Sequence, residues 1–275
     1  MTDMAPTIHE MLAVVLAREF DDEEVGFTGL LTGAAAATFG TAIPLVGMEL
    51  ARLTHAPNLT ILLAGCYHNP DFSDLDALPD SEHSAMLRDL PCEAQMVNYP
   101  GPWVLKRGDV DFGFSSAVQV DREGNINSVC VGPYENPKVR LVGPILQPEH
   151  MTLFGREYVM MPYHERRNFV EKVDYVSGVG YPGGLAGRRK LGLDRGGPAL
   201  VVTPKCIFDF DREEGLMKVR SIHPGVSAQE LQAATGFDLG DLSKIPTTPM
   251  PTAEELLLIR TRIDPRRILL RRFDA

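Results

Sequence analysis

The chain has 275 residues, 44% hydrophobic and 23% charged, an ordinary composition for a globular protein that buries a large core. Its formal net charge of −10 opposes nucleic acid and anionic membrane surfaces as main partners. The cysteines at 66, 92, 130 and 206 form no CxxC pair, so neither a metal site nor a disulfide framework is predicted, and a cytoplasmic location is expected. The acidic segment 1–10 is no signal peptide, and no apolar run approaches 18 residues, so no membrane span is predicted.

The first third of the chain has clear periodicity. Apolar residues at helical spacing predict a helix over 8–20 with Thr7 as its N-cap. A second helix is predicted over 43–53, with Pro44 in its first turn, where the missing N–H costs nothing. The preceding segment, 29–42, is rich in Gly, Ala and Thr, and no helix is predicted there.

The remaining elements are shorter. Residues 67–102 are rich in Pro, Asp and Ser, which predicts a long loop with one short helix near 82–87. Helices are also predicted at 228–235 and 253–261, with Ser227 and Thr252 as N-caps. Strands are predicted at 25–30, 59–63, 110–120, 129–131, 158–161, 172–177, 199–203, 206–210 and 217–222.

Strands that are mixed with helices predict an α/β sheet. No linker divides the chain, so residues 1–275 are predicted to form one domain. The segment Gly178–Gly183 fits G-x-G-x-x-G, but Pro182 and Gly184 oppose the helix that a dinucleotide site needs after it. Residues 164–167 read HERR rather than HExxH, so no zincin site is predicted.

Several segments, taken in order and spacing, resemble the β subunit of family I CoA-transferases, glutaconate CoA-transferase in particular. One of them, Gln119–Asn127, matches the family pattern Gln-x-Asp-x-x-Gly-Asn-x-Asn. The others are 41–66, 164–176, 190–193 and 197–203. The C-terminal segments 221–226, 234–237 and 251–265 are similar to the β subunit of the steroid ring-opening hydrolase, which shares the fold but cleaves a carbon–carbon bond in a cyclic acyl-CoA.

The resemblance also exposes a missing group. In the transferases, the strand after the Ala-Pro turn ends in the glutamate that carries CoA, and the matching residue here is Ala64. Transfer needs a carboxylate nucleophile, and residues 59–69 contain neither Asp nor Glu. The resemblance therefore implies the β subunit of a hydrolase that opens a cyclic β-keto acyl-CoA by retro-Claisen cleavage, in steroid or alicyclic catabolism. The fold that the resemblance implies is the α/β half-molecule of CoA-transferases (NagB/RpiA-like), an open and mostly parallel sheet with helices on both faces. The catalytic glutamate would come from an α subunit, in an α2β2 assembly.

Three alternatives stay open. The chain is a genuine CoA-transferase if a carboxylate from the 71–82 loop, such as Asp71, Asp74 or Glu82, replaces the missing one. It belongs to a decarboxylase-like branch if Cys66 is the reacting group. It is a structural half if its partner carries all the chemistry.

Site residues follow from the same resemblance. Cys66 and His68 are the catalytic candidates, with packing and solvation as the structural interpretations of each. Where transferases have a Gly-Gly-Ala turn near the thioester oxygen, this chain has Ser115-Ser116-Ala117. The residues expected to contact substrate or CoA are Ala64, Gly65, Ser115, Ser116, Ala117, Gln119, Asn125 and Asn127. For Gln119, Asn125 and Asn127, a purely structural role in a tight turn is equally open.

The remaining expectations are brief. No metal and no bound cofactor are expected, with CoA present only as part of the substrate. The segment 30–39 reads as an insertion beside the active-site entrance. Trp103 either covers an apolar substrate or packs in the core. The arginines at 260, 262, 266, 267, 271 and 272 are interpreted as a solvated face or a subunit contact rather than a site for CoA phosphates.

Overall fold

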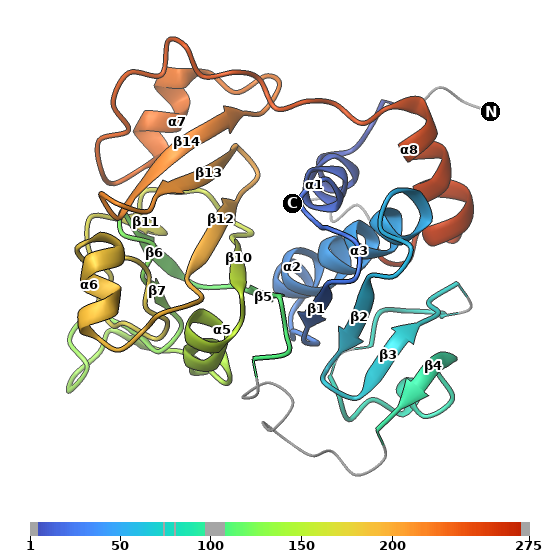
Figure 1. Cartoon of the computed structure of the whole chain (residues 1–275). Helices are drawn as coiled ribbons and strands as arrows, with labels where there is room; N and C mark the ends of the chain where they lie inside the picture. The colour runs from blue at the N-terminus through green and yellow to red at the C-terminus, as the bar shows by residue number, and fades with distance from the viewer. Residues whose placement is uncertain (1–4, 74, 80, 97–107, 271–275) are drawn as a thin grey trace. The chain divides into compact units, whose positions relative to one another are not determined.

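The computed structural model describes residues 5–73, 75–79, 81–96 and 108–270, which form two compact units (Figure 1). The first unit takes in residues up to 104, together with 109–114 and 249–275. The second comprises 105–108 and 115–248. That residues 1–275 form a single domain stays a prediction.

The first unit is built on parallel strands with an antiparallel edge. Its strands are β1 (Val25–Thr28), β2 (Thr60–Leu63), β3 (Tyr67–Pro70), β4 (Cys92–Gln95) and β5 (Phe112–Ser115), in the order β5-β1-β2-β3-β4. β1 pairs in parallel with β2 and β5, so that Gly26 lies opposite both Ile61 and Phe112, whereas β3 and β4 pair antiparallel. The buried parallel strand predicted at 59–63 is confirmed, since its last three residues are at most 1% exposed.

The long loop predicted over 67–102 is wrong in part, because β3 and β4 lie within it. These four-residue strands, of which β4 is at the edge, read Tyr-His-Asn-Pro and Cys-Glu-Ala-Gln. Backbone hydrogen bonds to the neighbouring strand hold them, so they show no hydrophobic period from which a strand could be predicted. The short helix expected near 82–87 is a single 3₁₀ turn, Ala85–Leu87.

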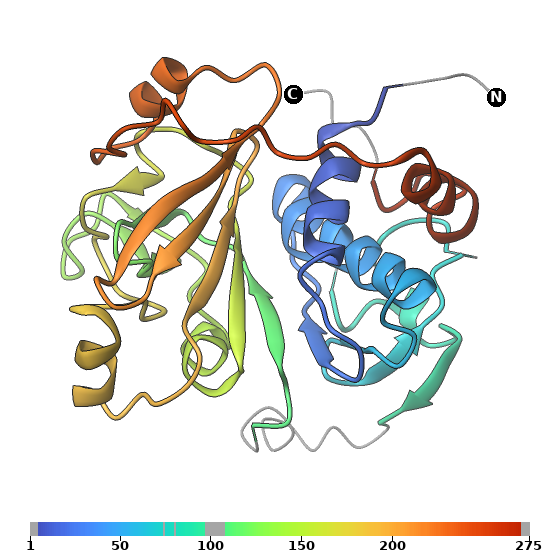
Figure 2. The same ribbon diagram turned by 45° about the horizontal axis from the view of Figure 1, so that its top comes forward.

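Capped helices of the first unit lie together on one side of its strands in both views (Figures 1 and 2). α1 (Ile8–Ala17) begins at Thr7, whose hydroxyl accepts from the Glu10 N–H while the Glu10 carboxylate accepts from the Thr7 N–H. α8 (Ala253–Leu258), which continues as the π-turn Ile259–Ile263, begins with the same reciprocal pair. Both predicted N-caps are confirmed, because the Thr-x-x-Glu pattern satisfies two backbone donors at once.

The helix predicted over 43–53 begins earlier than expected. α2 (Ala34–Ala37), the π-turn Thr38–Ala42 and α3 (Ile43–Thr54) follow each other without a break, which places Pro44 in the interior of a helix. In an α-helix the residue-44 N–H would bond the Gly40 carbonyl, and proline has no N–H. The chain widens into the π-turn before Pro44, and the Thr28 hydroxyl donates to the Gly40 carbonyl at 2.9 Å.

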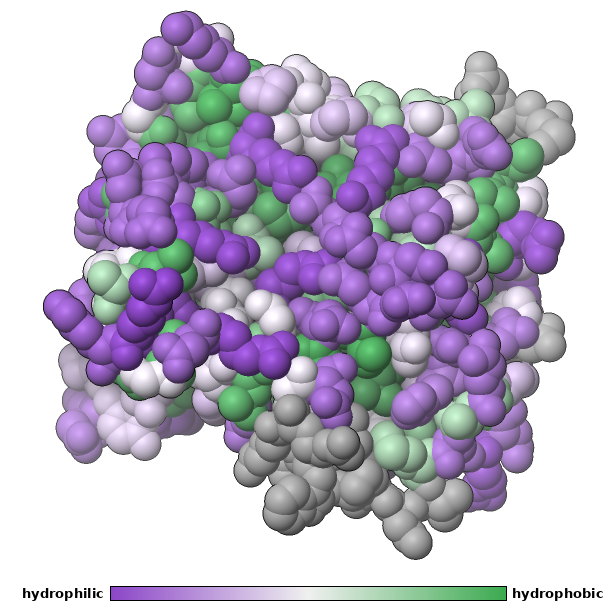
Figure 3. All heavy atoms as spheres, in the orientation of Figure 1, coloured by the Kyte–Doolittle hydropathy of each residue, from purple (hydrophilic) through white to green (hydrophobic). Residues whose placement is uncertain are grey.

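By length and composition this 34–54 helix is also apolar enough to cross a membrane. However, 72% of its most apolar window is buried within the structure, which is the usual environment of a core helix in a globular protein. The sequence criterion behind the prediction of no membrane span therefore missed this helix, whose burial is what identifies it as a core helix. Hydrophilic side chains cover most of the face shown in Figure 3, with apolar side chains in smaller areas.

The second unit contains a larger sheet and two small ones. Its strands run in the orders β14-β13-β12-β10, β11-β6-β7 and β8-β9, with β10–β12 and β11–β6 parallel and the other neighbouring pairs antiparallel. The strands are β6 (Gln119–Asp121), β7 (Ile126–Asn127), β8 (Cys130–Val131), β9 (Val139–Arg140), β10 (Arg156–Met160), β11 (Phe169–Val170), β12 (Pro198–Val202), β13 (Cys206–Asp211) and β14 (Leu216–Ile222). The helices are α5 (Gln147–Leu153), α6 (Gly184–Lys190) and α7 (Ala228–Ala234).

Most predicted strands of this unit exist, and three predictions are corrected. The strand expected over 110–120 is two strands, β5 and β6, separated by the turn at 116–118. Residues 172–177 form bends rather than a strand. α6 does follow the Gly178–Gly183 motif, because Gly183 takes a left-handed φ of 70° and Pro182 stays outside the helix.

The glycine motif nevertheless has a packing role. A Cβ on Gly180 would lie 2.1 Å from the Glu123 carbonyl oxygen, so only glycine allows this close approach. The first N–H groups of α6, those of Gly184 and Leu185, already donate to the carbonyls of Tyr181 and Arg212. No dinucleotide site follows from this seven-residue helix.

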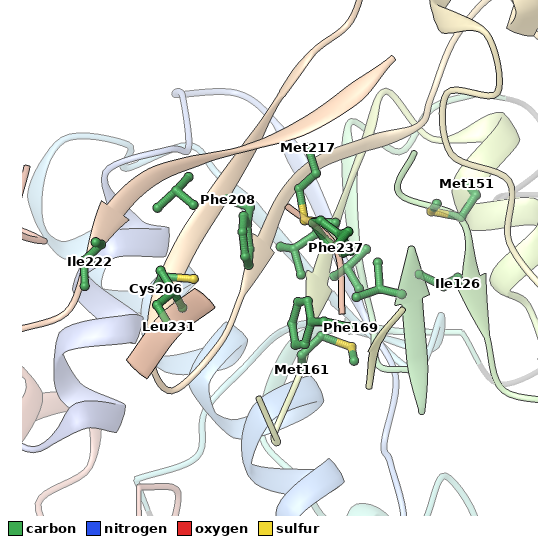
Figure 4. Close-up of a cluster of buried hydrophobic side chains, with 14 residues drawn as sticks. Ile126, Met151, Met161, Phe169, Cys206, Phe208, Met217, Ile222, Leu231 and Phe237 are labelled. Atoms are coloured by element: carbon green, nitrogen blue, oxygen red, sulfur yellow. The ribbon is translucent and has the colours of Figure 1, made fainter. Parts of the chain in front are cut away.

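The core of the second unit gathers side chains from several elements (Figure 4). Phe208 and Met217 come from the β13–β14 hairpin, Ile126 from β7, and Leu231 from α7. The imidazole ring of His164 stacks on the Phe169 ring, with 3.9 Å between the two ring centroids. A few buried polar side chains therefore belong to this core.

Two of these polar side chains are histidines. His164 is 4% exposed and lies within hydrogen-bond distance of the hydroxyls of Thr203 (2.9 Å) and Thr235 (3.1 Å). His223 is 3% exposed and contacts the Thr248 hydroxyl and the Thr203 carbonyl, both at 2.8 Å. Burial, followed by the charges of Lys205 and His223, lowers the pKa of His164 to about 3, and burial also lowers the pKa of His223.

These pKa shifts predict a loss of stability in mild acid. Because the folded pKa lies below the unfolded value, the unfolded chain binds the proton first, and stability falls as pH drops from about 6.5 toward 3. At pH 5, His164 alone is expected to contribute about 2 kcal/mol of this loss. Denaturant titrations between pH 7 and pH 5 measure the slope. His164→Gln should flatten it and the exposed His83→Gln should not; equal slopes in all three proteins would contradict this explanation.

The Thr28–Gly40 hydrogen bond predicts a second effect. Thr28→Val keeps the side-chain volume but leaves a buried carbonyl without its donor, so the free energy of unfolding should fall by about 1–3 kcal/mol. The matched control is Thr54→Val, whose hydroxyl bonds the Leu50 carbonyl at the exposed end of the same helix. That control should change stability by less than about 0.5 kcal/mol. Equal losses in the free energy of unfolding for Thr28→Val and Thr54→Val would contradict a special role for the Thr28–Gly40 hydrogen bond.

Candidate active site

The turn after β2 contains Ala64, which the sequence resemblance matches to the CoA-carrying glutamate. Ala64 has a φ of +52° and Gly65 a φ of +71°, and both follow the carboxyl end of β2. The Ala64 N–H donates to the Thr28 carbonyl at the end of β1, and the Cys66 N–H donates to the Leu63 carbonyl. A left-handed alanine costs roughly 1–2 kcal/mol, and such outliers gather at functional sites. The backbone of this turn is therefore held in its geometry by the two neighbouring strands.

Cys66 is half-buried in that turn. Burial raises the pKa of its thiol, and the negative charge of Glu82 raises it further. Only a thiolate is a strong nucleophile, so these surroundings disfavour the reactive form at neutral pH. The catalytic role expected for Cys66 stays a prediction.

His68 lies on β3, paired with Leu62 of β2 on one side and Ala94 of β4 on the other. Its Nε2 is buried and contacts no hydrogen-bond partner within the described residues. Ala64, Cys66 and His68 lie in the β2–β3 hairpin of the first unit, where the sequence predicted the start of a loop, and the catalytic role expected for His68 stays a prediction.

Glu82 is the loop acid that acts on this hairpin. Of the three carboxylates proposed from residues 71–82, it is the one whose charge bears on Cys66, and it is exposed. The Asp71 carboxylate accepts from the Ser73 N–H in its own turn, and Asp74 lies outside the described residues. The role of a loop carboxylate as replacement for the missing one stays a prediction.

The turn after β5 contributes two backbone donors in the second unit. The Ser116 carbonyl accepts from Gln147 Nε2 at 2.7 Å and from the Ser128 hydroxyl at 3.3 Å. Val118 pairs its N–H with the Asn127 carbonyl. Within the described part of the chain, the half-buried N–H groups of Ser116 and Ala117 donate to nothing. Paired, unoccupied backbone N–H groups of this kind can bind a developing oxyanion.

Next to this turn is a group that the sequence reasoning missed. The Ser115 hydroxyl donates to Glu157 Oε1 at 2.5 Å, and His150 Nδ1 lies 3.2 Å from the same oxygen. Glu157 is completely buried on β10, in the apolar run Arg-Glu-Tyr-Val-Met. A carboxylate at an inward position of a buried strand was the available sequence signal, since such groups need internal partners.

The side chains of Gln119, Asn125 and Asn127 are buried and bonded to their own unit. Gln119 donates to the Asp174 carboxylate at 3.0 Å and accepts from Asn127 Nδ2 at 2.7 Å. Asn125 donates to the Asp121 carboxylate and accepts from the Gly180 N–H. Burial raises the pKa of Asp121, while these hydrogen bonds oppose that rise. The observed contacts are those of the structural interpretation, and a substrate contact stays a prediction.

Other features lie apart from these residues. A depression of about 510 Å³ in the second unit is lined by Arg166, Glu171, Gln232, Ala233, Thr235, Gly236, Phe237 and Asp238, none of them a predicted site residue. In the C-terminal arginine segment, Arg260 pairs with Glu10, and Arg266 pairs with Asp76. Trp103, Arg271 and Arg272 lie outside the described residues. Across the described ranges, no three His, Cys, Asp or Glu side chains gather as metal ligands.

Comparison with known proteins connects this geometry to a family. The sequence profile described as Coenzyme A transferase matches residues 103–234. The B subunit of glutaconate CoA-transferase from Acidaminococcus fermentans is 31% identical over 94% of this chain and 93% of its own length. A crystal structure of that enzyme superposes with a TM-score of 0.77 at 30% identity, covering 97% of this chain and 98% of the matched one.

A second relative comes from a hydrolase. The cholesterol ring-cleaving hydrolase IpdB subunit of Rhodococcus jostii is 32% identical over 82% of this chain and 83% of its own length. The crystal structure of IpdAB from the same organism has a TM-score of 0.75 at 28% identity and covers all of both chains. The α/β fold is thereby confirmed, and the chain belongs to the coenzyme A transferase family.

Proposed function

We propose that this chain is the β subunit of a heteromeric acyl-CoA hydrolase that opens a cyclic β-keto acyl-CoA, in steroid or alicyclic catabolism. The observation that carries the proposal is Ala64 at the carboxyl end of β2, where a methyl group stands at the position that the resemblance assigns to the CoA-carrying glutamate. The similarity to the IpdB subunit of a cholesterol ring-cleaving hydrolase supports the same conclusion.

The reaction balances without a covalent carrier. A base removes a proton from water as the oxygen adds to the ring ketone carbon. The bond from that carbon to the α-carbon breaks, its electron pair forms the thioester enolate, and a proton then returns to the α-carbon. The products are a new carboxylic acid and the acyl-CoA end of the same opened molecule. The step requires a general base and donors for the enolate oxygen.

This chain supplies donors rather than the base. In the proposed mechanism, the N–H groups of Ser116 and Ala117 hold the thioester oxygen as it gains charge, because backbone donors survive the replacement of glycine side chains. The β2–β3 hairpin with His68 binds the CoA side of the substrate. The main catalytic glutamate is assigned to an α subunit, consistent with relatives that are themselves named as single subunits of larger enzymes.

The remaining parts of the proposal follow from this assignment. An α2β2 assembly in the cytoplasm is proposed, where the four free cysteines of the chain stay reduced. Coenzyme A enters as part of the substrate, and no further cofactor is required by the chemistry written above.

A second candidate function is CoA transfer with Glu82 as the nucleophile. The observation that favours it is that the negative charge of Glu82 raises the pKa of Cys66, which lies two residues after Ala64. A decarboxylase role through Cys66 has less support. The thiol pKa is raised, and the decarboxylase AibA/AibB, at 23% identity and a TM-score of 0.73, shares the fold only.

The first test separates hydrolysis from transfer. The chain is co-expressed with its α partner and incubated with a cyclic β-keto acyl-CoA, with and without acetate. Hydrolysis predicts ring-opened acyl-CoA at the same rate in both samples, with CoA retained on the acyl chain, measured by mass spectrometry. Acetyl-CoA that forms only with acetate would instead establish transfer.

The second test examines Glu82. Glu82→Gln removes the charge that raises the Cys66 pKa, so Cys66 should be alkylated by iodoacetamide faster at pH 8 than in the parent protein. In the proposed hydrolase, turnover should stay within about two-fold of the parent, because no transition-state contact is lost. Asp71→Asn is the matched control and should change neither value. A turnover loss of about a hundred-fold or more would favour the transferase.

A further inference from the structure

The buried group around Glu157 has no role in the reaction as written above. Ser115, His150 and Glu157 are 4%, 6% and 0% exposed. They come from the end of β5, from α5 and from β10, and both Ser115 and His150 contact the single oxygen Oε1. The other oxygen, Oε2, is buried and has no partner within the described residues. A buried carboxylate contributes little net stability, so its presence needs another explanation.

Gln147 provides a second contact from the same helix. It lies three residues before His150 on α5, so the two side chains share one face. Gln147 Nε2 donates to the Ser116 carbonyl, and the Ser177 hydroxyl donates to Gln147 Oε1 at 2.9 Å, which fixes the amide. His150 acts on Ser115 through Glu157, while Gln147 binds Ser116 directly. One helix thus restrains two successive residues of the turn.

The far end of the turn is restrained as well. The Val118 N–H donates to the Asn127 carbonyl at 3.0 Å, and Asn168 Nδ2 donates to the Val118 carbonyl at 2.9 Å. These contacts hold the segment in place while leaving the Ser116 and Ala117 N–H groups unoccupied within the described structure. The 115–118 segment is thus fixed at both ends, and its two adjacent N–H groups at Ser116 and Ala117 are preorganised to bind an oxygen ligand.

We propose that Glu157 and His150 are positioning residues of the acyl-CoA reaction, acting through the Ser115 hydroxyl to aim the Ser116 and Ala117 N–H groups at the thioester oxygen. This inference rests on the proposed function of that turn. Ser115 is not the nucleophile in this arrangement, since its proton is donated to Glu157 rather than to His150, and it is 4% exposed. A displacement of about 1 Å in such donors can lower the rate about a hundred-fold.

The test compares Ser115→Ala, Glu157→Gln and the double variant in the complex with the α partner. Each single variant should lower kcat at least about ten-fold and leave KM for the acyl-CoA within about two-fold, because the donors act on the transition state. The double variant should lose no more than the worse single variant, since both changes break one chain of contacts. Ser115→Thr, which restores a hydroxyl, should recover part of kcat.

The matched control is Ser221→Ala, which also removes a buried serine hydroxyl from the second unit, in this case 2.8 Å from the Thr248 hydroxyl. It should lower Tm but keep kcat within about two-fold. The proposal is overturned if Ser115→Ala keeps its kcat, or if its activity loss merely follows the loss of folded protein as in Ser221→Ala. Where Ser115→Ala does not fold, Glu157→Gln and His150→Gln decide in the same way.

Failure of this inference is distinguishable from failure of the proposed function. The variants are assayed in whichever acyl-CoA reaction the parent complex catalyses. Acetate-dependent transfer by the parent would refute the hydrolase assignment, while the pattern of kcat and KM among the variants would still decide the positioning role.

Discussion

Most polar groups that are buried away from water are paired within the protein, and such pairs shape the local structure of both units. In the first unit, Pro44 takes away the normal donor of the Gly40 carbonyl, and the hydroxyl of Thr28 replaces it. In the second unit, the Asp121 carboxylate accepts from the Asn125 amide. Each partner fixes a turn or a helix end next to a strand terminus, so the same hydrogen bonds that stabilise the fold also define the candidate site.

Elements whose partners are close in sequence could be predicted. Thr7 and Thr252 cap their helices through a glutamate three residues on, and both helices begin where the pattern places them. The apolar run of β2 was equally clear. The strands β3 and β4 could not be predicted, because backbone hydrogen bonds hold them and their side chains carry no hydrophobic period. The start of the 34–54 helix was missed because Pro44 reads locally as a first-turn residue, and its replacement donor lies on another strand.

In the candidate site, too, residues that are close in sequence could be predicted, whereas pairs that are far apart in sequence could not. Ala64, Cys66 and His68 were singled out because they follow the end of the predicted strand β2, although β3 itself was not predicted. Glu157 was missed because its partner Ser115 lies 42 residues away, and a single acidic residue in an apolar strand names no partner. The same holds for Gln147, which lies 31 residues from the Ser116 carbonyl that it binds and belongs to no motif. Pairing of this kind is decided by the sheet order, which composition and periodicity do not contain.

The geometry at Ala64 bears on how one fold supports different reactions. Its left-handed φ of +52° is imposed by the hydrogen bond to Thr28 and by the hairpin to β3, neither of which involves its side chain. A glutamate at this position would meet the same backbone conformation and a similar strain of roughly 1–2 kcal/mol. Exchange of a carboxylate for a methyl group therefore changes the available chemistry without changing the turn. The donors at Ser116 and Ala117 are backbone groups and are equally independent of side-chain identity. The proposed hydrolysis uses these two features together, since it needs donors for the thioester oxygen and takes water rather than a carboxylate as its nucleophile.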